Sequence, residues 1–203
     1  MDQVSAIPCV ALLTRRMGSV YLYKKIFYQS QSMTSIQQAG LNDTELLTNL
    51  GRQTFIESHG HSAAPEDIEA YIKEKYTHDA SNAALENTSN HYYILYHNEQ
   101  PAGYSNLIFN VPHENISFPN VTKLDRLYVL KQFYDQRLGS TLMNHNIVKK
   151  KQKGQAGMWL YVWKLNERAV QFYTKNGFNI IGSYDFSISA NHSNPNHQML
   201  LTY

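Results

Sequence analysis

The amino-acid sequence predicts a single domain of the α/β class, in which helices pack on one mixed sheet. Apolar, strand-like segments at 124–130 and 158–163 alternate with helix-like segments at 138–152 and 166–176, a pattern typical of strands joined by crossover connections. Earlier in the chain, turn residues at 97–100 separate two strand-like runs, which indicates an antiparallel hairpin. The hairpin and the crossovers together predict a sheet with both parallel and antiparallel neighbours.

Hydrophobic spacing, capping residues and turn residues define the individual elements. Asn42 or Asp43 can cap the first helix through its side-chain oxygen, and Pro65 suits the first turn of the second helix. Gly177 follows the last helix as its C-terminal stop. In chain order, the predicted elements are a strand at 34–39, helices at 43–57, 65–76 and 79–86, strands at 92–96 and 102–109, a loop at 110–120, a strand at 124–130, a helix at 138–152, a strand at 158–163, a helix at 166–176, and strands at 178–187 and 197–203.

The body of the chain is close to electrically neutral. The whole sequence of 203 residues carries 18 Lys and Arg against 16 Asp and Glu, a formal net charge of +2. Four of the basic residues and one acidic residue lie in the first 32 positions, which leaves 14 basic and 15 acidic residues beyond them. A near-neutral body lacks the basic surface typical of nucleic-acid-binding domains. We therefore expect no nucleic-acid partner.

The first part of the chain reads as an extension of the domain. We place the domain at 33–203, beginning at a methionine, and interpret 1–32 as an N-terminal extension that is disordered or translated from an upstream start codon. The apolar run at 10–13 is too short to cross a bilayer, so no membrane partner is expected, although a short amphipathic anchor at 20–27 remains an alternative. The sole cysteine, Cys9, cannot form a disulfide within the chain, which fits a reducing, cytoplasmic location.

A candidate phosphate-binding segment joins the strand at 124–130 to the helix that follows it. A helix N-terminus presents free backbone N–H groups and a partial positive charge, which favour a phosphate or diphosphate. Gly139 would let the backbone approach such a ligand, Ser140 and Thr141 can add hydroxyl donors, and Arg137 adds a positive charge. The alternative interpretation is an ordinary strand–loop–helix connection.

A second candidate segment is the helix at 166–176. Asn166 can cap this helix, and Tyr173 lies near the same face two turns later. A polar cap and a phenol on one face suit a ligand that lies along that face. The alternative interpretation of Tyr173 is a core ring whose hydroxyl is satisfied within the protein.

Together, and in this order, the two segments resemble the signature motifs of the GNAT superfamily of N-acetyltransferases. The second motif, Asn-x-x-Ala-x-x-Phe-Tyr-x-x-x-Gly-Phe, matches at all of its positions: Asn166, Ala169, Phe172, Tyr173, Gly177 and Phe178. The first motif, Gln/Arg-x-x-Gly-x-Gly/Ala, matches in part. Gly139 is in place, Arg137 stands where glycine is usual, and Tyr134, followed by Asp135, stands where Gln or Arg is expected.

The resemblance implies a fold, a cofactor and a set of cofactor contacts. The fold is a mixed, mostly antiparallel sheet of about six to seven strands flanked by four to five helices, and the co-substrate is acetyl-CoA, with no metal. A homodimer is a common assembly in the superfamily. The coenzyme A contacts implied by the motifs are Leu127, Tyr128, Val129, Tyr134, Gln136, Arg137, Leu138, Gly139, Ser140, Thr141, Asn166 and Tyr173.

The resemblance also implies direct attack of a primary amine on the thioester in a ternary complex. Asp125 is the candidate that takes the proton of the amine through water, with a salt bridge to Arg126 as the alternative role. A backbone N–H near Val129 would stabilise the oxyanion. Tyr173 would donate a proton to the departing thiolate, since a phenol and a thiol have similar ordinary pKa values.

Several segments look like the bacterial spermidine/spermine acetyltransferase branch, which predicts a small-molecule amine acceptor, specifically a polyamine. These segments are Gln53-Thr-Phe-Ile56, Pro65–Tyr71, Asp125–Lys131 and Val162-Trp163. The chain departs from this branch at 189–196, where it lacks the acidic turn between the last two strands. Alternative functions are acetylation of a protein N-terminus, an aminoglycoside or an aminoacyl-tRNA, or a catalytically idle acyl-CoA-binding module.

The acceptor is expected to bind among the first helices and the loop between them. The residues proposed to hold it are Phe55, Glu57, His59 and Tyr71, together with the carboxylates of Glu66 and Asp67. The His59-Gly-His61 pair cannot place both rings on one helical face, and no Cys or carboxylate lies at zinc-like spacing, so we expect no metal site.

Overall fold

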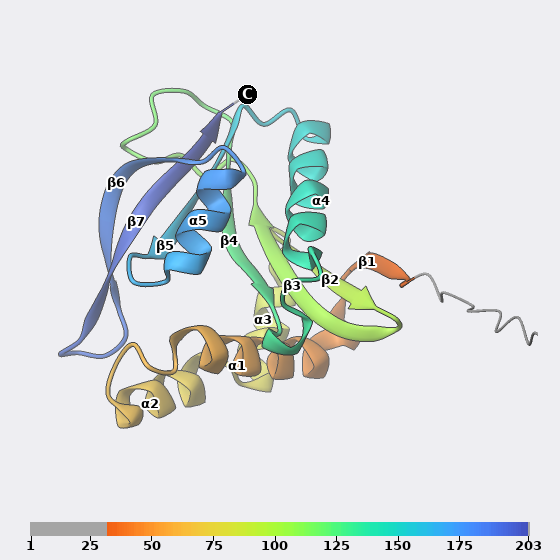
Figure 1. Ribbon diagram of the computed structural model, residues 1–203, viewed down its shortest axis with the longest axis vertical. Coiled ribbons are helices and arrows are strands. Elements are labelled where there is room, and N and C mark those ends of the chain that lie inside the picture. The colour runs from red at the N-terminus through yellow and green to blue at the C-terminus, as the bar shows by residue number, and fades with distance from the viewer. Residues whose placement is uncertain (1–31, 203) are drawn as a thin grey trace, which may run out of the picture. The chain divides into compact units, whose positions relative to one another are not determined.

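The computed structural model describes residues 32–202, which form a seven-stranded sheet with helices on both faces (Figure 1). The strands lie in the order β1-β2-β3-β4-β5-β7-β6. They are β1 (Thr34–Gln38), β2 (Asn90–His97), β3 (Gln100–Ile108), β4 (Val121–Val129), β5 (Gly157–Trp163), β6 (Asn179–Ser187) and β7 (Ser193–Thr202). The helices are α1 (Thr44–His59), α2 (Pro65–Lys75), α3 (His78–Glu86), α4 (Leu138–Gln152) and α5 (Glu167–Lys175), with short 3-10 turns η1 (Leu41–Asp43) and η2 (Lys131–Phe133). Only β4 and β5 pair in parallel, so the prediction of a mixed, mostly antiparallel sheet is confirmed. The extension predicted over 1–32 lies, apart from Ser32, outside the described residues.

Two of the predicted local signals at α5 are confirmed. The Asn166 side-chain oxygen accepts a hydrogen bond from the Ala169 N–H at 3.1 Å, which caps the helix. At the other end, Gly177 has a φ of +87°, and the Phe178 N–H returns to the Tyr173 carbonyl at 3.1 Å. This geometry ends the helix and suits glycine, because a side chain at positive φ is strained.

Several predicted details need correction. Neither Asn42 nor Asp43 caps α1 through its side chain; instead the Asp43 carboxylate accepts a hydrogen bond from the Gly40 N–H at 2.9 Å and stabilises η1. β4 begins at Val121 rather than 124, because it pairs there with the start of β5. β7 begins at Ser193 rather than 197, because its pairing with β6 continues to the turn between the two strands.

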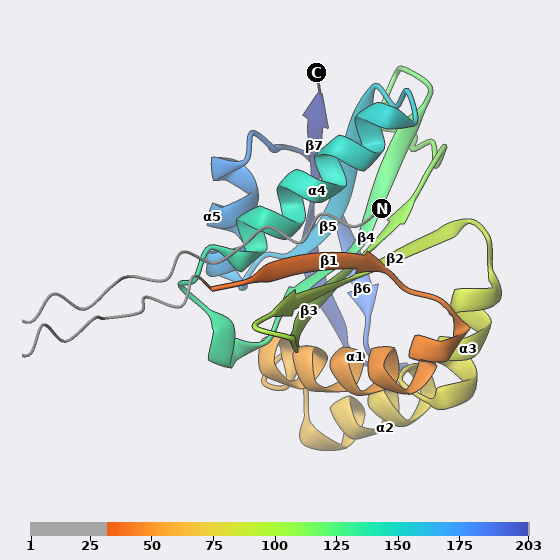
Figure 2. The same ribbon diagram turned by 90° about the vertical axis from the view of Figure 1, so that its right-hand side faces the viewer.

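The helices divide into two layers on opposite faces of the sheet (Figures 1 and 2). Consecutive residues of β3 show the division, since side chains alternate between faces along a strand. Tyr104 lies on the α1 side, close to Gly51, whereas the Ser105 hydroxyl donates to the Asn146 side-chain oxygen of α4 at 2.9 Å. α5 packs on the α4 side, where Tyr173 and Phe178 join the main core with Met143.

β4 and β5 separate soon after they meet. Their parallel pairing covers Val121–Lys123 against Gly157–Trp159 and no more of the described strands, although each strand continues for several residues. The other edge of β4 stays paired with β3 as far as Val129. The sheet therefore opens between two strands whose ends face both helix layers.

Gly103 is required where β3 supports the open end of β4. A Cβ at this position would meet the Tyr128 carbonyl oxygen and lie 3.0 Å from the Val129 Cα, both backbone atoms that cannot move aside singly. We predict that Gly103→Ala lowers the free energy of unfolding by about 1–3 kcal/mol, the usual cost of overpacking, as measured by urea denaturation. Gly40→Ala is the control, because nothing lies within 4 Å of its Cβ. Equal stability of the two variants would contradict this account of the strand pairing.

Candidate active site

A cavity of about 520 Å³ occupies the opening between β4 and β5, a size typical of small-molecule sites. It begins at the first turn of α4 and at α5, passes between the two strands, and reaches the side chains of α1 and α2. Of the coenzyme A contacts expected from the sequence, ten line it: Leu127, Tyr128, Val129, Tyr134, Arg137, Leu138, Gly139, Ser140, Asn166 and Tyr173.

The other two expected contacts, Gln136 and Thr141, do not line the cavity. The Thr141 hydroxyl donates to the Arg137 carbonyl at 3.3 Å, within the first turn of its own helix. The hydroxyl expected to bind a ligand is therefore committed to the helix start.

The loop before α4 has a backbone suited to an anion. Asp135 and Arg137 both adopt positive φ, at 63° and 58°, and Arg137 is the N-cap residue of α4 without a side-chain capping bond. The first intrahelical bond of α4 belongs to the Thr141 N–H, so the N–H groups before it are unpaired within the helix. Left-handed residues at a helix start turn successive N–H groups toward one point, which forms an anion-binding nest.

Arg168 of α5 supplies a positive charge at this end of the cavity. Its guanidinium lies 4.0 Å from the ring centre of Tyr134 and 3.1 Å from the Asp135 carboxylate. Tyr134 stands where the motif has Gln or Arg and Asp135 follows it, and both contact Arg168. Arg168 could not be predicted from the sequence, because its contact with Asp135 joins positions 33 apart in the chain.

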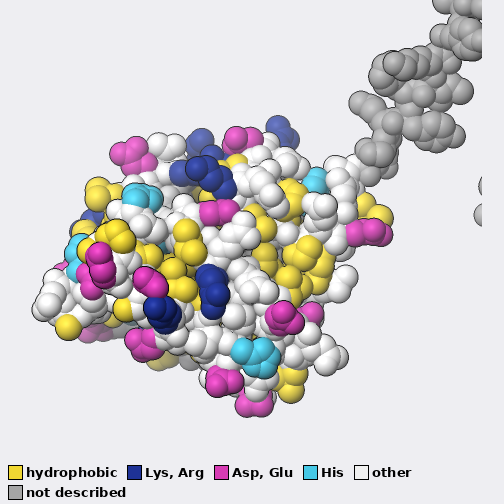
Figure 3. All heavy atoms as spheres, turned by 90° about the horizontal axis from the view of Figure 1, so that it is seen from below, with side chains coloured by type: hydrophobic (Ala, Val, Ile, Leu, Met, Phe, Trp, Pro, Cys, Tyr) yellow, Lys and Arg dark blue, Asp and Glu magenta, His cyan; other side chains and the backbone are white. Residues whose placement is uncertain are grey.

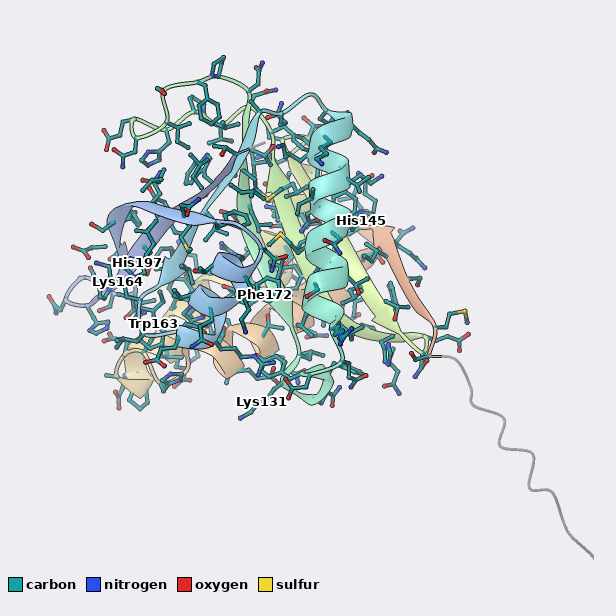
Figure 4. All side chains as sticks on the ribbon, turned by 45° about the horizontal axis from the view of Figure 1, so that its top comes forward. Lys131, His145, Trp163, Lys164, Phe172 and His197 are labelled. Carbon is teal, nitrogen blue, oxygen red and sulfur yellow. The ribbon has the colours of Figure 1, made fainter. Side chains whose placement is uncertain are left out.

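Tyr173 of α5 lines the cavity. Its side chain is only 8% exposed and packs edge-on against the rings of Phe172 and Phe178. Figure 4 shows Phe172 on α5 turned toward the start of α4, and a Cβ on Gly139 would lie 3.6 Å from its ring. Burial, with a smaller contribution from Tyr128, raises the pKa of Tyr173, so its phenol keeps its proton at neutral pH.

The free edge of β4 presents backbone donors to the cavity. The Leu130 N–H donates to the Ala102 carbonyl at 2.8 Å, toward β3. Because N–H groups alternate between the two edges of a strand, the Val129 N–H faces the opposite edge, where β5 has moved away. This is the backbone group that the sequence interpretation assigned to an oxyanion.

Asp125 occupies a β-bulge and is held by two cations. It lies between Leu124 and Arg126, which pair with consecutive β3 residues and leave it without a partner. Its carboxylate is 2.7 Å from the Lys123 Nζ and 3.1 Å from an Arg126 Nη1. Burial by itself raises the pKa of Asp125, but the charges of Arg126 and Lys123 outweigh it and leave the pKa below its ordinary value. The salt bridge to Arg126, the alternative role considered for Asp125, is therefore present, and its role in proton transfer stays a prediction.

Aromatic rings from three elements close the far end of the cavity. Phe55 stacks on His59 at 5.1 Å and on Tyr71 at 4.8 Å between ring centres. His59 in turn lies 6.0 Å from Trp163, which Figure 4 places at the end of β5. Of the six residues expected to hold the acceptor, Phe55, His59 and Tyr71 line this end.

The carboxylates expected at the acceptor end do not line the cavity. Glu57 accepts a hydrogen bond from the Lys131 N–H at 2.7 Å and so stabilises η2. Glu66 and Asp67 lie in the first turn of α2, where acidic side chains complement the helix dipole. Figure 3 shows the face formed by these helices, on which acidic and basic side chains are interspersed.

Neither a metal cluster nor a membrane-spanning helix is present in the part of the chain that the structure describes. Among residues 32–202, no three His, Asp or Glu side chains come together as metal ligands. Within the same residues, each helix is too short or too polar to cross a bilayer.

The comparison with known protein families agrees with this geometry. Residues 48–178, more than half of the chain, match the family described as the acetyltransferase (GNAT) family. The chain belongs to the GNAT family. The N-acetyltransferase assignment is therefore confirmed, and the cavity lies where the matched segment carries both of its motifs.

Named relatives of this GNAT chain are distant in sequence. An uncharacterized N-acetyltransferase of Lactobacillus delbrueckii subsp. lactis is 25% identical over 157 residues, 76% of this chain and 90% of the relative. A spermidine N(1)-acetyltransferase of Thermoplasma acidophilum is 27% identical over 145 residues, 71% of this chain and 88% of the relative. The crystal structure of the PaiA N-acetyltransferase from T. acidophilum, in complex with coenzyme A, superposes with a TM-score of 0.67 and 23% identity over 84% of this chain and 99% of that one, which shows the shared fold.

His59 makes stability depend on pH. Its pKa is lowered from 6.5 to about 4, mainly by burial and to a smaller extent by the charges of Arg126 and His61. Below pH 6.5 the unfolded chain binds a proton at this position that the folded chain does not, so stability falls as the pH decreases toward 4. We predict that, between pH 7 and 5, the wild type loses about 1–2 kcal/mol more unfolding free energy than His59→Gln. Urea denaturation at the two pH values measures this, and parallel losses in both proteins would show that His59 is not held neutral.

Proposed function

We propose that this GNAT chain transfers the acetyl group of acetyl-CoA to a small primary amine by direct attack in a ternary complex. The observation that carries the proposal is the continuity of one cavity from an anion-binding loop to an aromatic end, with Tyr173 and the free edge of β4 between them. The loop at Asp135–Arg137 and the start of α4 would bind the coenzyme A diphosphate. The pantetheine arm would then lie in the opening between β4 and β5.

The thioester would lie next to the Val129 N–H and the Tyr173 phenol. The neutral amine nitrogen forms a bond to the thioester carbon, and the resulting oxyanion accepts a hydrogen bond from Val129. The attached nitrogen, which is positively charged after the attack, loses a proton to water. The carbon–sulfur bond then breaks, and Tyr173 donates its proton to the departing thiolate, which leaves as coenzyme A. Tyr173 then regains a proton from solvent, so the proton lost by the nitrogen balances the one transferred to sulfur. The single cysteine of the chain is Cys9, outside the described residues, so no described residue offers a thiol for an acyl-enzyme.

The amine must lose a proton before it attacks, and Asp125 was the candidate for that step. Because Lys123 and Arg126 hold its pKa low, Asp125 is a weak base, and we propose that it orders water and the acceptor while the proton leaves to solvent. The rate per total amine should then rise with pH toward the ordinary amine pKa of about 10.4.

A polyamine remains a specific candidate for the acceptor. The name of the T. acidophilum spermidine acetyltransferase, at 27% identity, is the observation in its favour. Against it, Asp125 and Asp135 are the only carboxylates among residues 32–202 that line the cavity, and both are ion-paired. Release of free thiol from acetyl-CoA with spermidine, amino acids and peptides as acceptors tests the proposal. Binding of acetyl-CoA without thiol release from any of them would instead favour an idle acyl-CoA-binding module.

We predict that Tyr173→Phe lowers kcat by roughly 10²–10⁴-fold, because it removes the proton donor, and leaves the Kd for coenzyme A within about threefold. Since the Tyr173 pKa is raised, kcat of the wild type should show no loss up to about pH 9. Tyr96→Phe, on β2 outside the cavity lining, is the control. Steady-state kinetics with calorimetric coenzyme A binding measure both quantities, and an undiminished kcat in Tyr173→Phe would exclude this role.

A further inference from the structure

The wall of the cavity near the acceptor end carries two cations for one carboxylate. Lys123 and Arg126 contact opposite oxygens of Asp125, so both carboxylate oxygens are engaged. The exposed fraction of the side chain is 27% for Lys123, 31% for Arg126 and 18% for Asp125. This group, the Lys123–Asp125–Arg126 triad, therefore presents one net positive charge to the cavity.

No free carboxylate among the described residues neutralises this charge. Asp135, the other acidic residue in the lining, pairs with Arg168 at the opposite end. Glu57 bonds to the backbone of η2 and stays outside the lining. An acceptor that carries several positive charges would meet the triad without a carboxylate to bind.

The same wall offers hydrogen-bond donors that lack protein acceptors. Arg126 uses only Nη1 toward Asp125, and in the described part of the chain its Nε and Nη2 make no hydrogen bond. The phenols of Tyr71 and Tyr128 also line the cavity and have no hydrogen-bond partner among residues 32–202. A cation and unpaired phenol donors suit an anionic group, because hydrogen bonds to ionised acceptors are the stronger ones.

The charge of Arg126 extends to the aromatic end of the cavity. Burial is the main cause of the lowered pKa of His59, and the charge of Arg126 is the second largest. The neutral His59, Phe55 and Phe186 provide apolar surface at this end, which suits an uncharged substituent of the acceptor.

We infer that the acceptor is a primary amine that also carries a carboxylate, such as an amino acid with an apolar side chain. This inference rests on the proposed acetyl transfer. The carboxylate binds to Arg126 and the triad, the amine lies toward the opening between β4 and β5, and the apolar substituent contacts Phe55 and Phe186. A carboxylate matches the single net charge of the triad, whereas a phosphate would leave a negative charge without a partner.

Matched acceptor pairs test the inference with the full chain. Phenylalanine is compared with phenethylamine, and methionine with 3-(methylthio)propylamine, each pair differing only in the carboxylate. Each kcat/KM is divided by the fraction of neutral amine, since the carboxylate changes the amine pKa. We expect the carboxylated member to react at least about 10-fold better, as one hydrogen-bonded charge pair allows. O-phosphoethanolamine and spermidine complete the panel.

Variants of Arg126 test whether a preference for the carboxylated acceptor depends on the triad. Arg126→Met should reduce the preference for the carboxylated member about 10- to 100-fold, with the Kd of coenzyme A within about threefold of wild type. Arg126→Lys should retain most of the preference. Lys175→Met, an exposed residue at the end of α5, is the control and should change nothing. If Arg126→Met does not fold, Lys123→Met replaces it.

The outcomes separate this inference from the proposed function. Acetyl transfer that is faster to spermidine or phenethylamine, and insensitive to Arg126→Met, would overturn the inference and leave the acetyltransferase function in place. A preference for O-phosphoethanolamine over the amino acids would overturn the carboxylate assignment. No transfer to any amine, despite coenzyme A binding, would be a failure of the proposed function itself.

Discussion

The structure depends on the short parallel contact between β4 and β5. Three residues of each strand pair, and then the strands diverge while their outer edges remain paired with β3 and β7. A continuous sheet would satisfy the inner backbone groups and fill the space between the strands. Divergence leaves the Val129 N–H free and opens a cavity that connects the two helix layers. The bulge at Asp125 lies at this point, where bulges commonly redirect side chains, and it brings Lys123, Asp125 and Arg126 together on the cavity wall.

The loop before α4 contains local backbone strain. Asp135 and Arg137 occupy the left-handed region, which costs an L-residue on the order of 1 kcal/mol. The conformation turns the N–H groups at the start of α4 toward one point, and glycine is the usual residue where that turn is made. Here the ion pair from Asp135 to Arg168, and the contact of Arg168 with Tyr134, hold the loop from the side of α5. The two segments recognised in the sequence are therefore in contact with each other.

Structural features that depend on residues close together in the chain could be predicted from the sequence. The order of strands and helices, the Asn166 cap and the Gly177 stop depend on neighbouring residues and were found. Ten of the twelve coenzyme A contacts implied by the motifs line the cavity. Side chains whose partners are distant in the chain were not predictable in this way: Glu57 bonds to the backbone at Lys131, and Arg168 contacts Asp135. The role of Asp125 was ambiguous for the same reason, because both a base and an ion-paired carboxylate fit its sequence neighbours.

The most direct test of the account compares two ligands, of which only one carries the diphosphate. Calorimetry with the full chain would measure the Kd of coenzyme A and of pantetheine, which lacks the adenosine 3′-phosphate and the diphosphate. If the start of α4 binds the diphosphate, coenzyme A should bind at micromolar concentration and pantetheine at least about 100-fold more weakly, since two or more hydrogen bonds to charged oxygens are lost. Equal affinity for the two ligands, or no binding of coenzyme A at millimolar concentration, would contradict the account.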